Sequence, residues 1–376
     1  MPLKITSSRF AFCFLLAFPV LALAASPCES PLVLNITKNT QLDGACTYNT
    51  EFRISTSNVR LDCAGATLDG KGEASFGVRV DSKGAELSGV EIVNCNIVNY
   101  VKNGILVGWG MPDKDKLTAA NGSHDELYRR TPNGVIIRNT TVRNADRVGI
   151  YLDDYVTHTL IDHVSVINSG GVGLYLEHSS RENQVINSTF EGNGRQSPRE
   201  AIAVDSSAKN KFINNTFIDN KAGGIFLYRN CQERIHSDLQ TVHRWQGSDE
   251  NTIRGNSFRD NGTAIWVASR QSRNLTNFDC GDPAIGEGYF EDDAKRNVIE
   301  SNYFLKCATG IRIEDDENTI LNNEFSPACK QEIIVGSEVP FRIRGKAVVG
   351  TKVHGNVKKQ GRVTESVESQ RIFGAR

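Results

Sequence analysis

Asn-Lys-Phe-Ile-Asn-Asn-Thr-Phe, residues 210–217, is one of five copies of a short pattern that recurs along this chain. The other copies begin at Asn183, Asn251, Asn297 and Asn318, and each ends in Phe. Apolar and polar residues alternate within every copy, which is the period of a β-strand with one buried face. A repeated strand pattern of this kind predicts a solenoid built from short strands.

A second pattern, a small residue followed by strand formers, accompanies the first. It reads GIYL at 149–152, GLYL at 173–176, AIAV at 201–204 and GIFL at 224–227, so successive copies start 24, 28 and 23 residues apart. A leucine-rich repeat of this period would carry Leu at fixed offsets and a helical half, and neither is present. The fold class is therefore all-β, a parallel β-helix of about ten coils, in which equivalent Asn and Phe side chains stack from coil to coil.

The two ends of the chain differ from the repeats. Lys4 and Arg9 precede an apolar run that ends in Ala22-Leu23-Ala24, the layout of a secretory signal over residues 1–24. Residues 25–60 are expected to cap the solenoid at 61–336, because an open end would expose unpaired strand edges. Residues 337–376 are expected to form a C-terminal extension that is partly disordered.

Charge and cysteine usage narrow the function classes. The net charge is -1, so the chain lacks the basic field that nucleic-acid binding requires. Eight cysteines follow the signal, an even number that suits disulfides in an exported protein: Cys28, Cys46, Cys63, Cys95, Cys231, Cys280, Cys307 and Cys329. Neighbouring pairs are the simplest connectivity. We expect a secreted or periplasmic monomer that has no contact with the membrane after signal cleavage.

Three long insertions interrupt the repeats, at roughly 108–132, 229–250 and 269–296. All three leave the coil just after the strand that begins with the small residue. Insertions at one corner of a solenoid emerge on one side, where they build walls around a groove. The outward face of that strand is then the floor of the groove.

Alternation along that strand predicts which side chains lie on the floor. One outward column contains Tyr151, Tyr175, Ala203, Phe226 and Trp266. The neighbouring column contains Asp153, Glu177, Asp205 and Tyr228. Aromatic rows are surfaces on which sugars stack, and carboxylates on adjacent coils lie about 4.8 Å apart at the backbone. Like charges this close raise the pKa of at least one carboxyl, which supplies an acid and a base.

Cationic and titratable residues follow the same strands. His178 and Arg181 come after Glu177, Arg229 comes after Tyr228, and Arg270 opens the third insertion. Arginine neutralises carboxylates well, and a histidine or tyrosine can move the C5 proton of a uronate sugar. These residues favour β-elimination or C5 epimerisation of a uronate, with His178, Tyr155 or Tyr228 as base or acid and Arg229 or Arg270 as neutraliser.

No metal site is predicted with a recognised ligand spacing. The acidic residues of the third insertion could bind calcium through oxygen ligands, but a solvated loop is the preferred interpretation. They are Asp279, Asp282, Glu287, Glu291, Asp292 and Asp293.

The Asn-containing repeats at 183, 210, 251, 297 and 318, with GIYL, GLYL and GIFL, resemble the right-handed parallel β-helix proteins of the pectin-lyase-like superfamily. The resemblance covers about residues 55–335. It implies carbohydrate activity of several kinds, because that superfamily includes lyases, mannuronan C5-epimerases, glycoside hydrolases and accessory proteins. The Asp-Pro-His-Asp, Asn-Thr-Asp and Arg-Ile-Lys signatures of its enzymes are absent, so the resemblance supplies no catalytic residue.

The sequence favours an exported polysaccharide lyase or epimerase that acts on an extended, uronate-containing glycan. A glycoside hydrolase using Asp153, Glu177 and Asp205 is the first alternative, and a non-catalytic glycan-binding or adhesion protein is the second. The predicted catalytic residues are Asp153, Glu177, His178, Asp205, Tyr228 and Arg229. The predicted substrate-binding residues are Tyr151, Asp154, Tyr155, Tyr175, Arg181, Phe226, Trp266 and Arg270.

Overall fold

The computed structural model describes residues 26–111, 113–230, 232–233, 244–271, 278–279, 282–285 and 288–359. The expected signal segment, 1–24, lies outside the described residues. So do both cysteines of the expected pair Cys231–Cys280 and residues 360–376 of the expected C-terminal extension.

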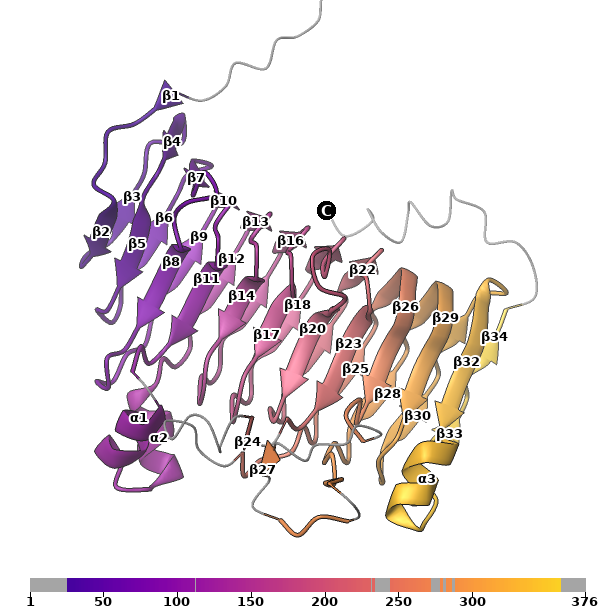
Figure 1. The fold of residues 1–376 in the computed structure, drawn as a ribbon. Helices are drawn as coiled ribbons and strands as arrows, with labels where there is room; N and C mark the ends of the chain where they lie inside the picture. Colours follow the sequence, from indigo (N-terminus) through magenta and orange to yellow (C-terminus); the bar gives the residue numbers. More distant parts are fainter. Residues whose placement is uncertain are drawn as a thin grey trace, which may run out of the picture.

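Three ladders of parallel strands run side by side along an elongated solenoid, and each coil contributes one strand to each ladder (Figure 1). Ladder 1 is the 11-stranded sheet. Its strands are β3 (Thr40–Gln41), β6 (Arg60–Asp62), β9 (Glu91–Val93), β12 (Ile136–Arg138), β15 (Leu160–Asp162), β18 (Gln184–Ile186), β21 (Lys211–Ile213), β25 (Thr252–Arg254), β28 (Val298–Glu300), β30 (Thr319–Leu321) and β33 (Lys352–His354). The expected parallel solenoid is thereby confirmed.

Ladders 2 and 3 together form the 21-stranded sheet, because two strands of 11 residues, β26 (Ser257–Val267) and β29 (Tyr303–Ile313), cross both. The other strands of ladder 2 are β1 (Ser26–Pro27), β4 (Cys46–Tyr48), β7 (Thr67–Asp69), β10 (Asn96–Val98), β13 (Thr141–Arg143), β16 (Ser165–Ile167), β19 (Thr189–Glu191), β22 (Thr216–Ile218), β31 (Glu324–Phe325) and β34 (Val357–Lys358). Those of ladder 3 are β2 (Val33–Ile36), β5 (Glu51–Ile54), β8 (Phe76–Asp81), β11 (Asn103–Gly108), β14 (Val148–Leu152), β17 (Leu174–Leu176), β20 (Glu200–Asp205), β23 (Gly223–Tyr228) and β32 (Cys329–Val335).

The interior is a column of apolar side chains from all three ladders. The Phe of each repeat is fully buried, and the rings of Phe217 and Phe258 stack with centroids 4.7 Å apart and planes 8° apart. The Phe stack requires a small residue at the start of the ladder 3 motif, as Gly224 shows. A Cβ on Gly224 would lie 2.6 Å from the ring of Phe258 and 2.4 Å from the carbonyl oxygen of Ala264. The GI-x-L pattern therefore marks the place where the chain bends around the Phe column.

Buried Asn side chains form hydrogen-bonded ladders along the solenoid, as expected. The Oδ1 of Asn251 accepts both the backbone N–H of Asn210, at 2.9 Å, and its Nδ2, at 3.0 Å. Asn251 in turn donates its Nδ2 to the Oδ1 of Asn297 at 3.1 Å. A second ladder of the same kind contains Asn215, Asn256, Asn302, Asn323 and Asn356. Each amide thus satisfies polar backbone atoms that a turn would leave buried and unpaired.

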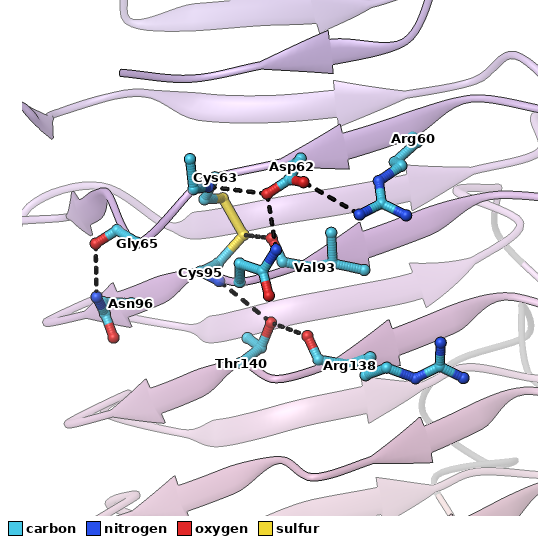
Figure 2. Close-up of a disulfide and its surroundings, with 11 residues drawn as sticks. Arg60, Asp62, Cys63, Gly65, Val93, Cys95, Asn96, Arg138 and Thr140 are labelled. Carbon is cyan, nitrogen blue, oxygen red and sulfur yellow. Dashed lines mark hydrogen bonds and ion pairs between the residues drawn. A yellow bond between two sulfur atoms is a disulfide. The ribbon is translucent and has the colours of Figure 1, made fainter. Parts of the chain in front are cut away.

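Three of the expected disulfides are present, Cys28–Cys46, Cys63–Cys95 and Cys307–Cys329. Figure 2 shows that Cys63–Cys95 joins neighbouring coils at the corner between ladders 1 and 2. Cys307 and Cys329 are directly paired across β29 and β32. Each bridge therefore reinforces the stacking of one coil on the next.

The repeat architecture continues at both ends of the described chain. The segment expected as a cap, 25–60, contributes β1 to β5, which stack in register on the coils below. Beyond residue 336, α3 (Glu338–Arg344) precedes β33 and β34, which pair with β30 and β31. Residues 337–359 therefore add a further, incomplete coil.

The insertions leave the solenoid after ladder 3, as expected, and their described elements lie along one edge of it (Figure 1). The first contains α1 (Asp113–Ala119) and α2 (His124–Arg130). The second and third pair through the short strands β24 (Gln232–Glu233) and β27 (Phe278–Asp279). Asp292, near the end of the third insertion, accepts backbone N–H groups from Arg229 and Arg270, at the starts of the two insertions. Within the described part of the chain, no helix has the length and apolar character that crossing a bilayer requires.

Replacing Asn251 with Ala tests the amide ladder. Because the change leaves two buried N–H donors of Asn210 without an acceptor, we expect the free energy of unfolding to fall by about 1–3 kcal/mol. The measurement is a denaturant titration. Thr252→Ala, at the next and half-buried position, is the control and should have a much smaller effect. Equal losses in both variants would contradict a special role for the amide.

Candidate active site

The outer face of ladder 3 carries the predicted columns in register. Tyr151 pairs with Tyr175, Tyr175 with Ala203, Ala203 with Phe226, and Phe226 with Trp266. In the neighbouring column, Asp205 pairs with Tyr228. The parallel register therefore places side chains that are 23 to 40 residues apart on adjacent coils.

Five residues at the middle of this face form what we call the tyrosine–carboxyl cluster: Tyr151, Tyr175, Glu177, Asp205 and Arg244. Tyr151 donates its hydroxyl to Glu177 Oε2 at 2.6 Å, and Tyr175 donates its hydroxyl to Asp205 Oδ2 at 2.7 Å. The tyrosine rings stack with centroids 5.4 Å apart. Arg244, from the second insertion, forms ion pairs with Glu177 and, at 3.1 Å, with Asp205. One guanidinium thus bridges two carboxylates on successive coils.

The two carboxyls of this cluster have different surroundings. Asp205 is fully buried and also accepts the backbone N–H and Nδ2 of Asn230, at 3.0 and 2.9 Å. The Glu177 side chain is 12% exposed. Burial raises the pKa of Glu177 to about 7, against the opposing charge of Arg244. Glu177 can therefore exchange a proton near neutral pH, whereas Asp205 is held in place by four donors.

A second pair of carboxyls lies at the end of β14, beside the first insertion. Lys116, buried on α1, lies 3.0 Å from Asp154 Oδ2 and 3.5 Å from Asp153 Oδ2. Burial raises the pKa of Asp153, while the charge of Lys116 opposes the shift. The Asp153 side chain is 23% exposed, the most of these acids. Lys116 is thus a cation of the candidate site that lies in the first insertion.

Tyr228 belongs to a buried network and not to an open surface. Its hydroxyl lies 2.9 Å from both Glu200 and Arg199, and the guanidinium of Arg270 lies over its ring at 3.9 Å. Burial raises the pKa of the Tyr228 phenol well above its usual value. We expected Tyr228 and Arg270 to face a ligand. They instead contact each other and neighbouring protein side chains, and so stabilise the outer face of ladder 3.

The aromatic column is partly covered as well. Phe226 is buried and meets Trp266 edge to face at a centroid distance of 5.5 Å. Arg312 lies over the Trp266 ring at 4.5 Å. Alternation placed these rings correctly outside the core, but they pack in an apolar cluster of their own with Ala203 and Val172. An aromatic row open along its whole length, as expected from the sequence, is not what the structure shows.

The remaining predicted residues gather at the corner after β14 and β17. His178 is buried with its ring 5.4 Å from that of Tyr155, and its Nε2 has no hydrogen-bond partner among the described residues. Burial lowers the pKa of His178 to about 4, so the imidazole is neutral at pH 7. Arg181 lies over the ring of Tyr128, from α2, at 3.8 Å. These contacts attach the first insertion to the solenoid.

Arg229 forms its ion pairs with acidic residues outside the tyrosine–carboxyl cluster. It is buried, with Nη1 2.8 Å from Asp282 and 2.6 Å from Asp293. Its role among the described residues is to link the second and third insertions.

The residues of the acidic third insertion do not fit a calcium ion where they are described. Among the described residues, oxygens of Glu291, Asp315 and Asp316 lie within 4.8 Å of one another. Arg344 Nη2 from α3 lies among them, at 3.1, 3.4 and 2.7 Å. A guanidinium already neutralises these carboxylates and occupies the place that a cation would take.

Comparison with known proteins identifies the fold family. The model of the right-handed β-helix region matches residues 76–242 and 232–348. The chain belongs to the right-handed β-helix family. The resemblance seen in the sequence is thereby confirmed for the fold and its handedness. Comparison with curated protein sequences gives no significant match.

Two solved structures with a fold similar to that of this β-helix protein are a tailspike protein and an epimerase module. A mutant tailspike protein of E. coli bacteriophage HK620, in complex with a pentasaccharide, is 12% identical with a TM-score of 0.50. The match covers 87% of this chain and 58% of the tailspike chain. The A-module of a mannuronan C-5 epimerase from Azotobacter vinelandii is also 12% identical, with a TM-score of 0.50 and coverage of 88% and 81%. At this identity the likeness shows the fold alone.

Two cations of the site were missed from the sequence. Arg244 and Lys116 both lie in insertions, where neither period nor spacing relates a residue to the columns. The sequence indicated them only indirectly. All insertions of this β-helix protein leave the solenoid after ladder 3, so residues of the insertions were expected near this face.

The pKa of Glu177 tests the geometry of the cluster. Since Arg244 lowers this pKa and burial raises it, Arg244→Gln should move it above the value of about 7 in the parent protein. The measurement is a carbon-13 NMR titration of labelled Glu carboxyls, assigned with Glu177→Gln. Arg254→Gln, which removes an exposed arginine of ladder 1 that pairs with Glu300, is the control. A Glu177 pKa near 4.5 in the parent protein would refute the buried environment.

Proposed function

We propose that this protein binds an extended, uronate-containing polysaccharide along the outer face of ladder 3 and cleaves it by β-elimination or epimerises it at C5. The observation that carries the proposal is the Tyr151–Glu177–Arg244 group. It combines a carboxyl with a pKa of about 7, a phenol that is hydrogen-bonded to it and a guanidinium that forms an ion pair with it. The three disulfides and the sequence of residues 1–24 support an exported protein.

The chemistry of uronates needs what this group supplies. Removal of the C5 proton places negative charge on the sugar carboxylate, which a cation must stabilise. Arg244 and Lys116 are the cations that reach the two carboxyl pairs, in place of Arg229 and Arg270. Ionised Glu177 accepts the C5 proton, and Tyr151, whose pKa burial raises well above its usual value, keeps its own proton to donate. In elimination that proton goes to the departing O4. Epimerisation needs a second donor on the opposite face of C5, because the Tyr151 hydroxyl lies on the same side as Glu177.

Hydrolysis is the second candidate, and one observation favours it. Asp153 and Glu177 occupy the ends of neighbouring ladder 3 strands, and burial raises the pKa of both. Strands on adjacent coils are about 4.8 Å apart, close to the separation of about 5 Å between the carboxyls of retaining glycosidases. In that reaction protonated Glu177 would be the acid. Asp205, fully buried, would position Tyr175 and Arg244 and would not touch the sugar.

Incubation with uronate-containing and neutral polysaccharides tests the proposal. We expect an unsaturated product that absorbs in the ultraviolet, or a changed uronate composition without cleavage. Glu177→Gln should lower kcat by about 100-fold or more, because it removes the proton acceptor. Glu182→Gln, an acid near the same corner that pairs with His158, should stay within about twofold of the parent protein. Glycan binding without turnover would instead indicate a binding protein.

The pH dependence of kcat separates the two reactions. If Glu177 must be ionised to accept a proton, kcat rises as pH passes through about 7, and this limb moves to higher pH in Arg244→Gln. If Glu177 must be protonated, as in hydrolysis, kcat falls through the same range. A profile without a limb near pH 7 would exclude Glu177 from either role.

A further inference from the structure

The first and second insertions meet at Tyr155, which is buried at the corner after β14. Its hydroxyl oxygen lies 2.7 Å from Nδ1 of His124, at the start of α2. The same oxygen accepts the indole N–H of Trp245, from the second insertion, at 3.2 Å. The ring of Tyr128 packs edge-on against Tyr155 at a centroid distance of 4.9 Å. One phenol thus joins two insertions that are more than 100 residues apart in sequence.

Tyr155 occupies a backbone position that is costly for a bulky residue. Its φ is +60°, in the left-handed region, where a residue with a Cβ costs about 1–2 kcal/mol. The left-handed residues that follow ladder 3 in the next two coils are Ser179 and Ser206, both small. Strained positions that keep a large side chain are concentrated at functional sites. Other large residues, such as Lys83, also have positive φ in this solenoid, so Tyr155 is distinguished by its contacts with His124 and Trp245.

Those contacts hold Trp245 in a defined orientation at the surface. Trp245 is 45% exposed, while Trp109 is fully buried and Trp266 half-buried, so it is the exposed tryptophan of the chain. Its N–H is fixed by Tyr155, and its ring lies against His124 with centroids 4.6 Å and planes 35° apart. A freely rotating surface indole would lose more entropy on binding a ligand than one that is already oriented.

The indole is linked to the tyrosine–carboxyl cluster through Tyr155, whose ring lies 5.4 Å from that of His178, the residue after Glu177. The residue before it, Arg244, contacts Glu177 and Asp205. Trp245 is therefore one residue along the chain from the cation of the candidate active site. Burial lowers the pKa of His124, so the imidazole beside the indole is neutral at pH 7.

We propose that Trp245, oriented by Tyr155 and His124, is a stacking subsite for a pyranose ring of the glycan whose neighbouring sugar lies at Glu177. This rests on the function proposed above. An uncharged indole face attracts the C–H face of a sugar, and Arg244, the preceding residue in the chain, is a cation that suits a uronate carboxylate. The ligand class is an oligosaccharide of several pyranose units, because the proposal places one sugar at Glu177 and another on the indole.

A purely structural role for Trp245 makes different predictions. If the indole only joined the two insertions, its removal would affect folding and turnover. The affinities for long and short glycans would then change by the same factor. If it forms a subsite, its removal affects binding of the longer chain. The decisive quantity is therefore the ratio of affinities for long and short oligosaccharides.

The experiment compares Trp245→Ala and Trp245→Phe with the parent protein, using hexamers and dimers of mannuronate, guluronate and galacturonate. Binding is followed by calorimetry and, in the parent protein, by tryptophan fluorescence; turnover is followed on the corresponding polymers. In Trp245→Ala we expect Kd and KM for the bound hexamer to rise about tenfold, with a smaller change in kcat and in affinity for the dimer. Trp245→Phe keeps an aromatic face and should recover part of the loss.

Phe341→Ala removes another exposed aromatic, on α3, and is the matched control that should leave binding and turnover unchanged. Equal hexamer affinity in Trp245→Ala and the parent protein would overturn the subsite, even if the protein is an enzyme. Binding that depends on Trp245 without turnover would support the subsite and reject the enzymatic function. If no hexamer binds the parent protein, both the subsite and the proposed substrate class fail. Unchanged melting temperatures show that each variant is folded.

Discussion

Parallel stacking of coils in register is the constraint on which the structure depends. Buried Asn Oδ1 atoms accept N–H groups from the preceding coil, two of them in the case of Asn251, so a coil that slipped by one residue would leave buried donors without acceptors. The same register aligns the Phe rings inside. Because the inward residues are fixed in columns, the outward residues between them are fixed too. The positions of the candidate active-site residues on ladder 3 therefore follow from the register that the core requires.

The sequence predicted the columns well because a period of two follows directly from strand geometry. Tyr151, Tyr175, Phe226 and Trp266 are aligned as expected, and three neighbouring cysteine pairs are joined. Exposure could not be predicted in the same way. Whether an outward ring meets a ligand or a protein atom depends on neighbours that a period of two does not specify. Phe226 packs against Trp266, and Tyr228 contacts Arg199 and Arg270. Arg244 was missed because it lies in an insertion, whose sequence has no period.

The charged residues of ladder 3 divide into those that build the face and those that can react on it. Asp205 and Glu200 are buried and surrounded by donors, which fixes their positions. Glu177 and Asp153 keep some exposure and have raised pKa values, because burial is not fully offset by Arg244 and Lys116. Carboxyls of the same chemical type therefore have different roles, which depend on their neighbours in space. Those neighbours cannot be read from the sequence. The cations come from two different insertions, so the site requires both.

Asp292 has a consequence for how such a protein can change over evolutionary time. Its carboxylate accepts the N–H of Arg229, at the root of the second insertion, and that of Arg270, at the root of the third. Exchanging the third insertion alone would remove this carboxylate and orphan a backbone donor in the second. The second and third insertions therefore depend on each other. Recombination that changes substrate specificity would have to transfer residues 229–296 together.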